Sequence, residues 1–436
     1  MKSSPTRRVL LAGAGIVALA VPLAACSGGG GSSDGKTEIS FLTQNTGTNV
    51  DVANAFIDAF EKANPDITVK LETQPAGTEG DNLMKTKLAT GEMEDVFGYN
   101  SGSLFQALNP DQNLVPLDDE EWVDGLIDTM KNVVSTDSHI YGAPMGASQA
   151  GAIVYNKKVY ADLGLSVPKD WAEFEANNEK IKAAGITPVI QTYGDTWTSQ
   201  LFVLGDFGNV LAADPDWAEA YTKGERKYVD EPASAGFDNQ QEGFDKGWWN
   251  ADYASALYDD GAKMVATGVG AQYPILTGIV STFQQNYPDD LENLGVFALP
   301  AHDAADTKLT VWLPNAVYIP KTTEGDKLEA AKKFVAFINS PDGCEIQTTV
   351  MVPSGPFATS ACTLPDDVPG LLKDMQPYFD EGNTNPALEF LSPIKGPNLE
   401  NITVQVGSGI SSAADGAALY DEDVVKQAQQ LGLEGW

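Results

Sequence analysis

Amide and aromatic side chains that occur together in short polar loops are the residues of this sequence best suited to chemistry. Gln44 and Asn45 lie in the loop QNTGTN, and Tyr99 and Asn100 lie in the loop GYNSGS. Amides form paired hydrogen bonds with hydroxyl groups, and aromatic rings pack against apolar surfaces. These loops therefore predict the binding of an uncharged ligand. The alternatives are a glycine-containing turn that starts a helix for the first loop, and a core role for Tyr99.

Later candidates lie in QTYGDTWTSQ, which follows the predicted strand 186–194: Tyr193, Asp195 and Trp197. Trp197 is the strongest of them, because a tryptophan among polar neighbours is hard to explain by core packing alone. None of these loops carries an arginine, and Arg226 is the only arginine beyond residue 8. The sequence therefore offers little to pair with the carboxylate of an amino acid or peptide.

The sequence supports an enzymatic function less well than it supports ligand binding. The two histidines, His139 and His302, have neither a zinc-ligand nor a nucleophile spacing, and the motifs GxSxG and HExxH do not occur. A glycoside hydrolase needs two carboxylates, but among 61 acidic residues such pairs arise by chance. We expect no catalytic residue, cofactor or metal, and keep a tethered secreted glycoside hydrolase as an alternative.

The predicted strands and helices that position these loops alternate along the chain, as in an α/β fold. Residues 36–45 and 66–74 read as strands, 51–64 as an amphipathic helix stopped by Pro65, and 95–100 as a short buried strand. Strand and helix then alternate as in a parallel sheet. A later helix, 170–185, has Asp170 as its cap and Gly185 at its end.

The amino terminus predicts export. Residues 1–25 combine basic residues with an apolar run that ends in small residues, which is typical of a secretory signal. Leu23–Cys26 resembles the lipobox of bacterial lipoproteins, which implies a lipid on Cys26. Residues 26–35 form a flexible tether, rich in glycine and serine. We therefore expect a protein anchored by lipid to the outer face of the cell membrane.

The net charge excludes one class of partner, and the cysteine content predicts one covalent cross-link. The net charge of −34 excludes binding of nucleic acid through a basic surface. Cys344 and Cys362 form an even pair in an exported chain, which predicts a disulfide, with two free thiols as the alternative. The length predicts two domains or lobes.

Short motifs along nearly the whole mature chain resemble one protein family. In order they are FEKANPDITV, KLATGEMEDVFGY, IYGAPMGASQAGAIVYNKKVYADLGLSVPKDWAEF, IKAAGITPVI, GAKMVATG, VFALPA, KKFVAFINSPDG and DEDVVKQAQQLGLEGW. Together they resemble the extracellular solute-binding proteins of sugar ABC importers, the group that includes maltose-binding protein.

The resemblance implies a two-lobed α/β fold of the periplasmic-binding-protein type II, with three hinge crossings at 143–147, 297–301 and 351–355. Lobe 1 would comprise 36–144 and 301–351, and lobe 2 would comprise 148–297 and 355–436. A monomer would close on a neutral oligosaccharide, such as an α-galactoside of the raffinose kind or an α-glucoside. It would then deliver the sugar to the membrane permease.

The resemblance also implies further ligand contacts. Gln149 follows the first crossing, and Trp312 and Asn315 lie near the second. The segment EFLSPIKGP matches the part of lobe 2 that supplies a late ligand contact in relatives, which makes Glu389 and Lys395 candidates.

The sequence departs from the family pattern in ATGVGAQYPIL (residues 266–276). Relatives commonly carry a tryptophan two residues past the first glycine, and this chain has Gly270 there. Gln272 or Tyr273 would then replace the missing contact. A surface adhesin lipoprotein is a further alternative to the transport function.

Overall fold

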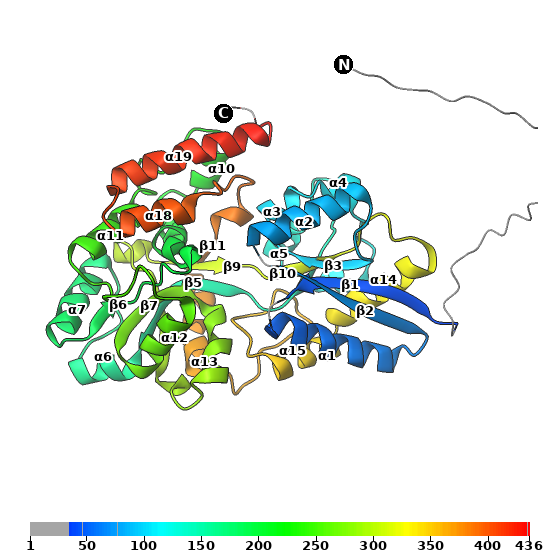
Figure 1. Cartoon of the computed structure of the whole chain (residues 1–436), viewed down its shortest axis with the longest axis horizontal. Helices are drawn as coiled ribbons and strands as arrows, with labels where there is room; N and C mark the ends of the chain where they lie inside the picture. The colour runs from blue at the N-terminus through cyan, green and yellow to red at the C-terminus, as the bar shows by residue number, and fades with distance from the viewer. Residues whose placement is uncertain (1–34, 46, 76, 434) are drawn as a thin grey trace, which may run out of the picture.

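The described part of the chain forms two α/β lobes, each built around its own β-sheet (Figure 1). The computed structural model describes residues 35–45, 47–75, 77–433 and 435–436. The predicted signal peptide, Cys26 and the tether as far as residue 34 lie outside the described residues. Across the described part of the chain, no helix is both long and apolar enough to cross a bilayer.

Lobe 1 begins with the strand–helix–strand pattern that the sequence predicted. β1 (Thr37–Gln44) and β2 (Ile67–Gln74) pair in parallel along their whole length, and α1 (Gly47–Ala63) connects them. Val52, Phe56 and Phe60 follow one another every four residues on α1, so one face of the helix is buried in the core. β3 (Val96–Tyr99) is also parallel to β1, and the carboxyl ends of the two strands therefore lie at the same edge of the sheet.

The sheet of lobe 1 has the order β2-β1-β3-β10-β4, in which β10 (Asn315–Tyr318) runs antiparallel to β3 and to β4 (Ala143–Met145). The other elements of this lobe are α2 (Gly77–Thr90), α3 (Ser103–Gln106), α4 (Pro110–Asn113), η1 (Glu121–Gly125), α5 (Asp128–Val133), α14 (Gly325–Ile338) and α15 (Pro341–Val350).

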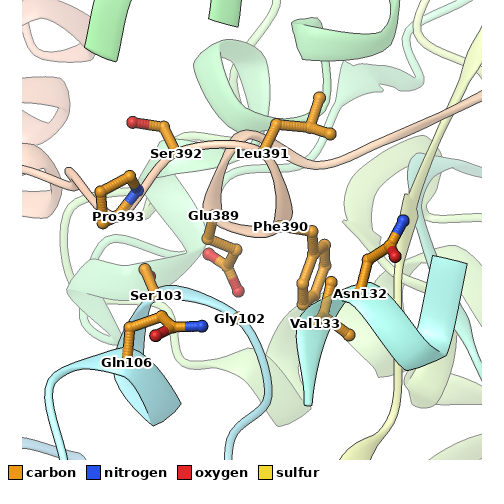
Figure 2. A pocket seen from close by; sticks show the side chains of 10 residues that line it. All are labelled: Gly102, Ser103, Gln106, Asn132, Val133, Glu389, Phe390, Leu391, Ser392 and Pro393. Carbon is orange, nitrogen blue, oxygen red and sulfur yellow. The ribbon is translucent and has the colours of Figure 1, made fainter. Parts of the chain in front are cut away.

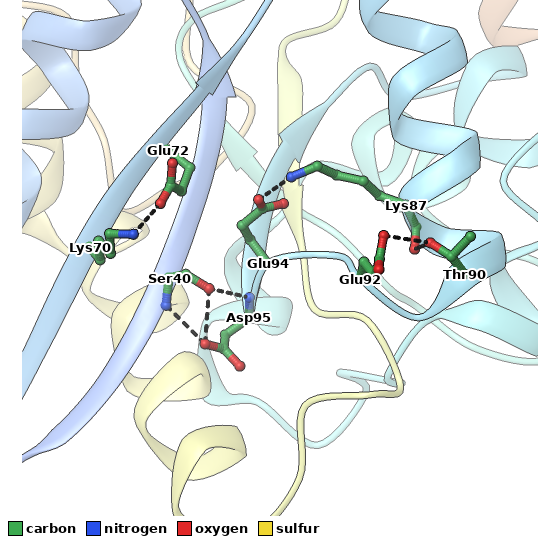
Figure 3. Close-up of polar contacts among 8 residues, drawn as sticks. All are labelled: Ser40, Lys70, Glu72, Lys87, Thr90, Glu92, Glu94 and Asp95. Carbon is green, nitrogen blue, oxygen red and sulfur yellow. Dashed lines mark hydrogen bonds and ion pairs between the residues drawn. The ribbon is translucent and has the colours of Figure 1, made fainter. Parts of the chain in front are cut away.

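Polar contacts tie the start of β3 to β1 (Figure 3). The Asp95 carboxylate accepts hydrogen bonds from the Ser40 backbone N–H (2.9 Å) and hydroxyl (3.0 Å). The Asp95 N–H donates in turn to the Ser40 hydroxyl (3.0 Å). Lys87 of α2 pairs with Glu94 beside them. These bonds fix the register of β3 and hence the place of the loop that follows it.

Lobe 2 is organised around β5 (Gln149–Asn156), which is antiparallel to β7 (Gly270–Leu276), β8 (Leu294–Ala298) and β9 (Leu309–Trp312). β6 (Thr187–Val189) pairs with β7, and β11 (Thr384–Pro386) pairs with β9. The Asp170 carboxylate accepts from the Glu173 N–H at the start of α7 (Trp171–Ala183), which confirms the predicted cap.

The remaining elements of lobe 2 are α6 (Lys157–Leu163), η2 (Thr196–Gln200), α8 (Leu201–Leu204), α9 (Phe207–Ala213), α10 (Trp217–Thr222), α11 (Ala235–Asp245), α12 (Tyr258–Thr267), η3 (Thr277–Ile279), α13 (Val280–Asn286), η4 (Leu291–Asn293), η5 (Ala304–Asp306), α16 (Gly370–Lys373), α17 (Gln376–Asp380), η6 (Leu388–Phe390), α18 (Leu399–Gly407) and α19 (Ala413–Gln430).

Two short segments connect the sheets. The first is residues 146–148, between β4 and β5, next to the predicted crossing at 143–147. The second is Leu313–Pro314, between β9 and β10, which corrects the prediction of a crossing at 297–301. β9 belongs to lobe 2 because Trp312 pairs with Gln149 on β5, so the predicted lobe 1 segment 301–351 starts too early.

The third connection is longer than the predicted crossing at 351–355. Met351 packs against the core of lobe 1, and Val352 packs against the core of lobe 2. The chain then returns to lobe 1, where Ala358 is buried in the core, and it contacts the core of lobe 2 again from Val368 onward. Lobe 2 therefore does not begin at residue 355.

The predicted disulfide between Cys344 and Cys362 is present, with 5.3 Å between the Cα atoms. Cys344 lies on α15, which packs against α1. The segment before Cys362 is bonded to lobe 1 as well, since the Ser360 N–H donates to the Gly125 carbonyl (2.8 Å). The disulfide therefore fastens the returning segment to lobe 1 and does not join the two lobes.

Candidate ligand-binding site

A cavity of about 320 Å³ lies between the lobes, and we call it the central cavity. Its lining combines amides, aromatic rings, leucines and one ion pair: Gln44, Asn100, Ser101, Gln149, Trp197, Gln200, Leu201, Leu204, Leu276, Trp312, Leu313, Asn315, Glu389, Phe390 and Lys395. Lobe 1 and lobe 2 both contribute, and so does Leu313 of the second crossing. Apolar walls with a few placed polar groups are typical of small-molecule sites.

Lobe 1 supplies amide side chains from the ends of its strands. Gln44 ends β1, Asn100 follows β3, and Asn315 begins β10, which pairs with β3. Among the described residues, none of these three side chains forms a hydrogen bond within the protein, so all can bind a ligand. The loop itself is held in place, because the Tyr318 hydroxyl donates to the Asn100 carbonyl (3.0 Å) and the Ser101 hydroxyl donates to the Pro314 carbonyl (2.9 Å).

Two tryptophans from lobe 2 form aromatic walls. Trp312 lies over Gly151 so closely that a Cβ atom there would come within 2.4 Å of the indole ring. The absence of a Cβ atom on Gly151 therefore leaves room for the ring of Trp312 against β5. Trp197 is 37% exposed, and its ring lies 5.8 Å from that of Tyr258. Both indoles offer apolar faces to the cavity and keep ring N–H groups that can donate hydrogen bonds.

One ion pair lines the central cavity. Lys395 Nζ lies 3.1 Å from the Glu389 carboxylate. The two charges cancel, so the lining carries no formal net charge. Together the pair offers ammonium donors and carboxylate acceptors, which suits hydroxyl groups better than a charged ligand.

Three predicted site residues lie in the core of lobe 2 instead. Gln272 is fully buried, where its carbonyl accepts from the Tyr160 hydroxyl (2.8 Å) and its amide donates to Asn178 (2.5 Å). Tyr273 shares a hydrogen bond with Thr192 (2.7 Å), and Tyr193 accepts one from Gln240 (3.0 Å). Burial raises the pKa of both tyrosines. Because their polar groups are used inside the lobe, we leave all three out of the proposed site.

Three more candidates lie near the cavity without lining it. Tyr99 is buried in the core of lobe 1, where desolvation and the nearby Asp81 raise its pKa. Asn45 is exposed after β1, and its N–H donates to the Gln74 carbonyl (2.8 Å). The Asp195 carboxylate accepts from the Tyr258 N–H (2.7 Å) at the start of α12.

The sequence reasoning missed several lining residues. They are Ser101, Gln200, Leu201, Leu204, Leu276, Leu313 and Phe390. Ser101 and Phe390 are direct neighbours of the predicted Asn100 and Glu389, and that adjacency was the only signal for them. The leucines have the local pattern of any buried residue, so nothing in the sequence marks them as lining.

A protein-family model and several known proteins match this chain in sequence. The family model described as bacterial extracellular solute-binding protein matches residues 46–343. A multiple sugar-binding protein of Streptococcus mutans is 31% identical over 209 residues, 46% of this chain and 48% of that protein. The match thus spans about half the length of this relative. An uncharacterized ABC transporter extracellular-binding protein of Pyrococcus horikoshii is 26% identical over 361 residues, covering 74% of this chain and 76% of that one.

Solved structures share the fold over most of the chain. A chitin oligosaccharide binding protein superposes with a TM-score of 0.76 at 22% identity, covering 90% of this chain and 99% of that one. A solute-binding protein in complex with raffinose superposes with a TM-score of 0.74 at 19% identity, covering 89% and 100%. At these identities the likeness concerns the two-lobed fold.

Proposed function

Since the chain belongs to the family of bacterial extracellular solute-binding proteins, we propose that it captures a neutral oligosaccharide between its lobes and delivers it to an ABC permease. The observation that carries this proposal is the lining of the central cavity. Gln44, Asn100 and Asn315 keep unused amides, and they line the same cavity as Trp197 and Trp312 of lobe 2. A sugar ring has hydroxyls for the amides and apolar C–H faces for the rings.

An α-galactoside of the raffinose kind or an α-glucoside is the ligand class that we propose. The neutral Glu389–Lys395 pair disfavours acidic sugars, because neither charge is free to meet an ionised ligand. A titration of the purified mature chain tests the class. Differential scanning calorimetry of the protein is repeated with galactose, melibiose, raffinose, stachyose, maltose and maltotriose. The sugar that binds should raise the melting temperature of the protein, since a ligand that binds the native state stabilises it. If no sugar shifts the melting temperature or binds in calorimetry, the proposal fails.

Binding is favoured over hydrolysis by the carboxylates available. Among the described residues that line the central cavity, Glu389 is the only acid, and it is paired with Lys395. Glycoside hydrolysis usually requires two carboxylates on opposite sides of the bond that breaks. Incubation with the sugar that binds, followed by chromatography of the products, should return the sugar intact. Released monosaccharide would support the hydrolase alternative.

Lobe closure distinguishes a transport receptor from an adhesin. We propose that the protein is a monomer whose lobes close around the sugar by rotation at the crossings. Small-angle scattering should then show a smaller radius of gyration with the bound sugar. An unchanged radius would favour an adhesin.

We also propose that Cys26 carries the lipid that holds the protein at the extracellular face of the membrane. Two acyl chains on one residue suffice for stable anchoring. Expression of the full chain and of Cys26→Ala in a lipoprotein-processing bacterium tests this proposal. The unchanged chain should partition with the membrane and incorporate labelled palmitate, whereas Cys26→Ala should do neither.

A further inference from the structure

A second cavity of about 300 Å³ adjoins the central cavity, and we call it the outer cavity. α3 and α5 of lobe 1 line one side, and residues 389–393 of lobe 2 line the other (Figure 2). Glu389 and Phe390 line both cavities, so they form a shared wall. A ligand that fills both cavities would therefore pass these two residues.

Polar groups without a partner line the lobe 1 side of the outer cavity. Ser103 is only 9% exposed, and in the described part of the chain neither its hydroxyl nor the Asn132 amide forms a hydrogen bond. Gln106 donates through its amide nitrogen to the Ser135 carbonyl (2.8 Å), which leaves its side-chain oxygen as an acceptor. Figure 2 shows Ser103 and Gln106 on one side, with Asn132 on the other.

Apolar groups complete the outer cavity. The ring of Phe390 lies between Glu389 and Val133 in Figure 2, and Leu391 is 43% exposed at the rim. Glu389 is the only charged side chain among the described residues of this lining, and Lys395 neutralises it. The chemistry therefore matches that of the central cavity: uncharged hydrogen-bonding groups beside an aromatic face.

We propose that the outer cavity is a second carbohydrate subsite, which takes a sugar unit linked to the one in the central cavity. The inference rests on the proposed function and adds to it that the oligosaccharide chain passes Phe390 into the outer cavity. A sugar unit in the outer cavity contacts α3 and α5 of lobe 1 and the 389–393 segment of lobe 2 together. Each added contact therefore favours the closed arrangement of the lobes.

The dependence of affinity on chain length tests the subsite. The probes are two series: galactose, melibiose, raffinose and stachyose, and glucose, maltose, maltotriose and maltotetraose. In calorimetry with the mature chain, affinity within the series that binds should rise about 10-fold or more once the sugar is long enough to reach the outer cavity. Equal affinity at all lengths would overturn the subsite, whereas failure of every sugar would contradict the proposed function itself.

Two variants localise the effect. Asn132→Trp fills the outer cavity from the exposed surface of α5 and should remove the gain for long sugars, leaving the shortest bound sugar within about 2-fold. Asn132→Ala adds no bulk and should weaken long sugars by about 2- to 10-fold through the lost hydrogen bond. The matched control is Asn54→Trp at an exposed position of α1, and this variant should bind every length as the unchanged chain does. If Asn132→Ala weakens sugars of every length equally, or weakens none of them, the proposal is overturned, because this variant cannot obstruct closure.

Discussion

Replacement of Gly102 by alanine should weaken sugar binding by keeping the lobes apart. Gly102 follows β3 with a φ of 71° and a ψ of −137°. A Cβ atom there would lie 2.5 Å from the Glu389 carbonyl oxygen and 2.8 Å from Cδ1 of Phe390, both in lobe 2. Ordinary van der Waals contact with a Cβ atom begins at 3.4 Å, so the Glu389 carbonyl oxygen would have to move away by about 0.9 Å.

Neither side of this contact can give way easily. The Gly102 N–H donates to the Val133 carbonyl of α5 (2.8 Å), which fastens it to lobe 1. On the other side, the Ala387 N–H donates to the Val311 carbonyl of β9 (2.9 Å), which fastens the Glu389 segment to lobe 2. Overpacking of this kind costs about 1–3 kcal/mol, which corresponds to a loss of sugar affinity of about 5- to 150-fold.

Calorimetry with the bound sugar of the panel measures this loss, and small-angle scattering measures closure. Backbone strain at the positive φ will also lower the free energy of unfolding by about 1–3 kcal/mol. Gly164→Ala controls for that strain, since Gly164 has a φ of 62° and nothing within 4 Å of its Cβ position. It should lose stability but bind the sugar normally. If Gly102→Ala binds with unchanged affinity and compacts fully, the lobes do not meet here in the bound state and the reasoning is refuted.

Three further predictions concern single features of the fold. Trp312→Ala should weaken sugar binding in calorimetry by about 10- to 150-fold, because it removes the aromatic wall over Gly151 and about 1.5–3 kcal/mol of apolar contact; unchanged affinity would exclude stacking there. The double variant Cys344→Ser with Cys362→Ser should lower the free energy of unfolding in urea by about 3 kcal/mol, since the bond closes a loop with a sequence separation of 18. Its sugar affinity should not change, as both cysteines lie outside the cavity lining and on the lobe 1 side. Burial raises the pKa of Asp206 to about 8, so between about pH 4 and pH 8 the native state holds a proton that the unfolded chain has lost, and stability falls as the pH rises. Asp206→Asn should flatten this slope and raise the free energy of unfolding at pH 8, by up to the order of 5 kcal/mol in urea titrations; an unchanged slope would contradict it.

The part of the site at the carboxyl edge of lobe 1 could be predicted from the sequence. Parallel strands joined by a helix have their carboxyl ends on one edge, so the loops after β1 and β3 must lie close together. The sequence patterns of residues 36–45 and 95–100 are enough to identify both strands. Gln44 and Asn100 line the cavity for this reason.

The positions on β7 could not be predicted in the same way. β7 lies between β5 and β6 in the sheet, and helix α12 covers it. A strand that is buried on both faces shows no alternation to tell a cavity side from a core side. Gln272 looks like a ligand contact in the sequence, but Asn178 and Tyr160 are distant in the chain and take up its amide. Only the tertiary structure shows these partners.

The second crossing explains why Trp312 and Asn315 belong to one site and yet to different lobes. Proline and glycine occur in FALPA, but they mark a stiff or bent backbone and not a change of sheet. The change of sheet takes place at Leu313–Pro314, so Trp312 pairs with β5 in lobe 2 and Asn315 pairs with Met145 in lobe 1. Only two residues separate them, and a rotation of the lobes must therefore change the angle between the indole and the amide. If the proposed sugar contacts both side chains, it will favour one value of that angle, and we therefore expect ligand binding and lobe closure to be coupled at this crossing.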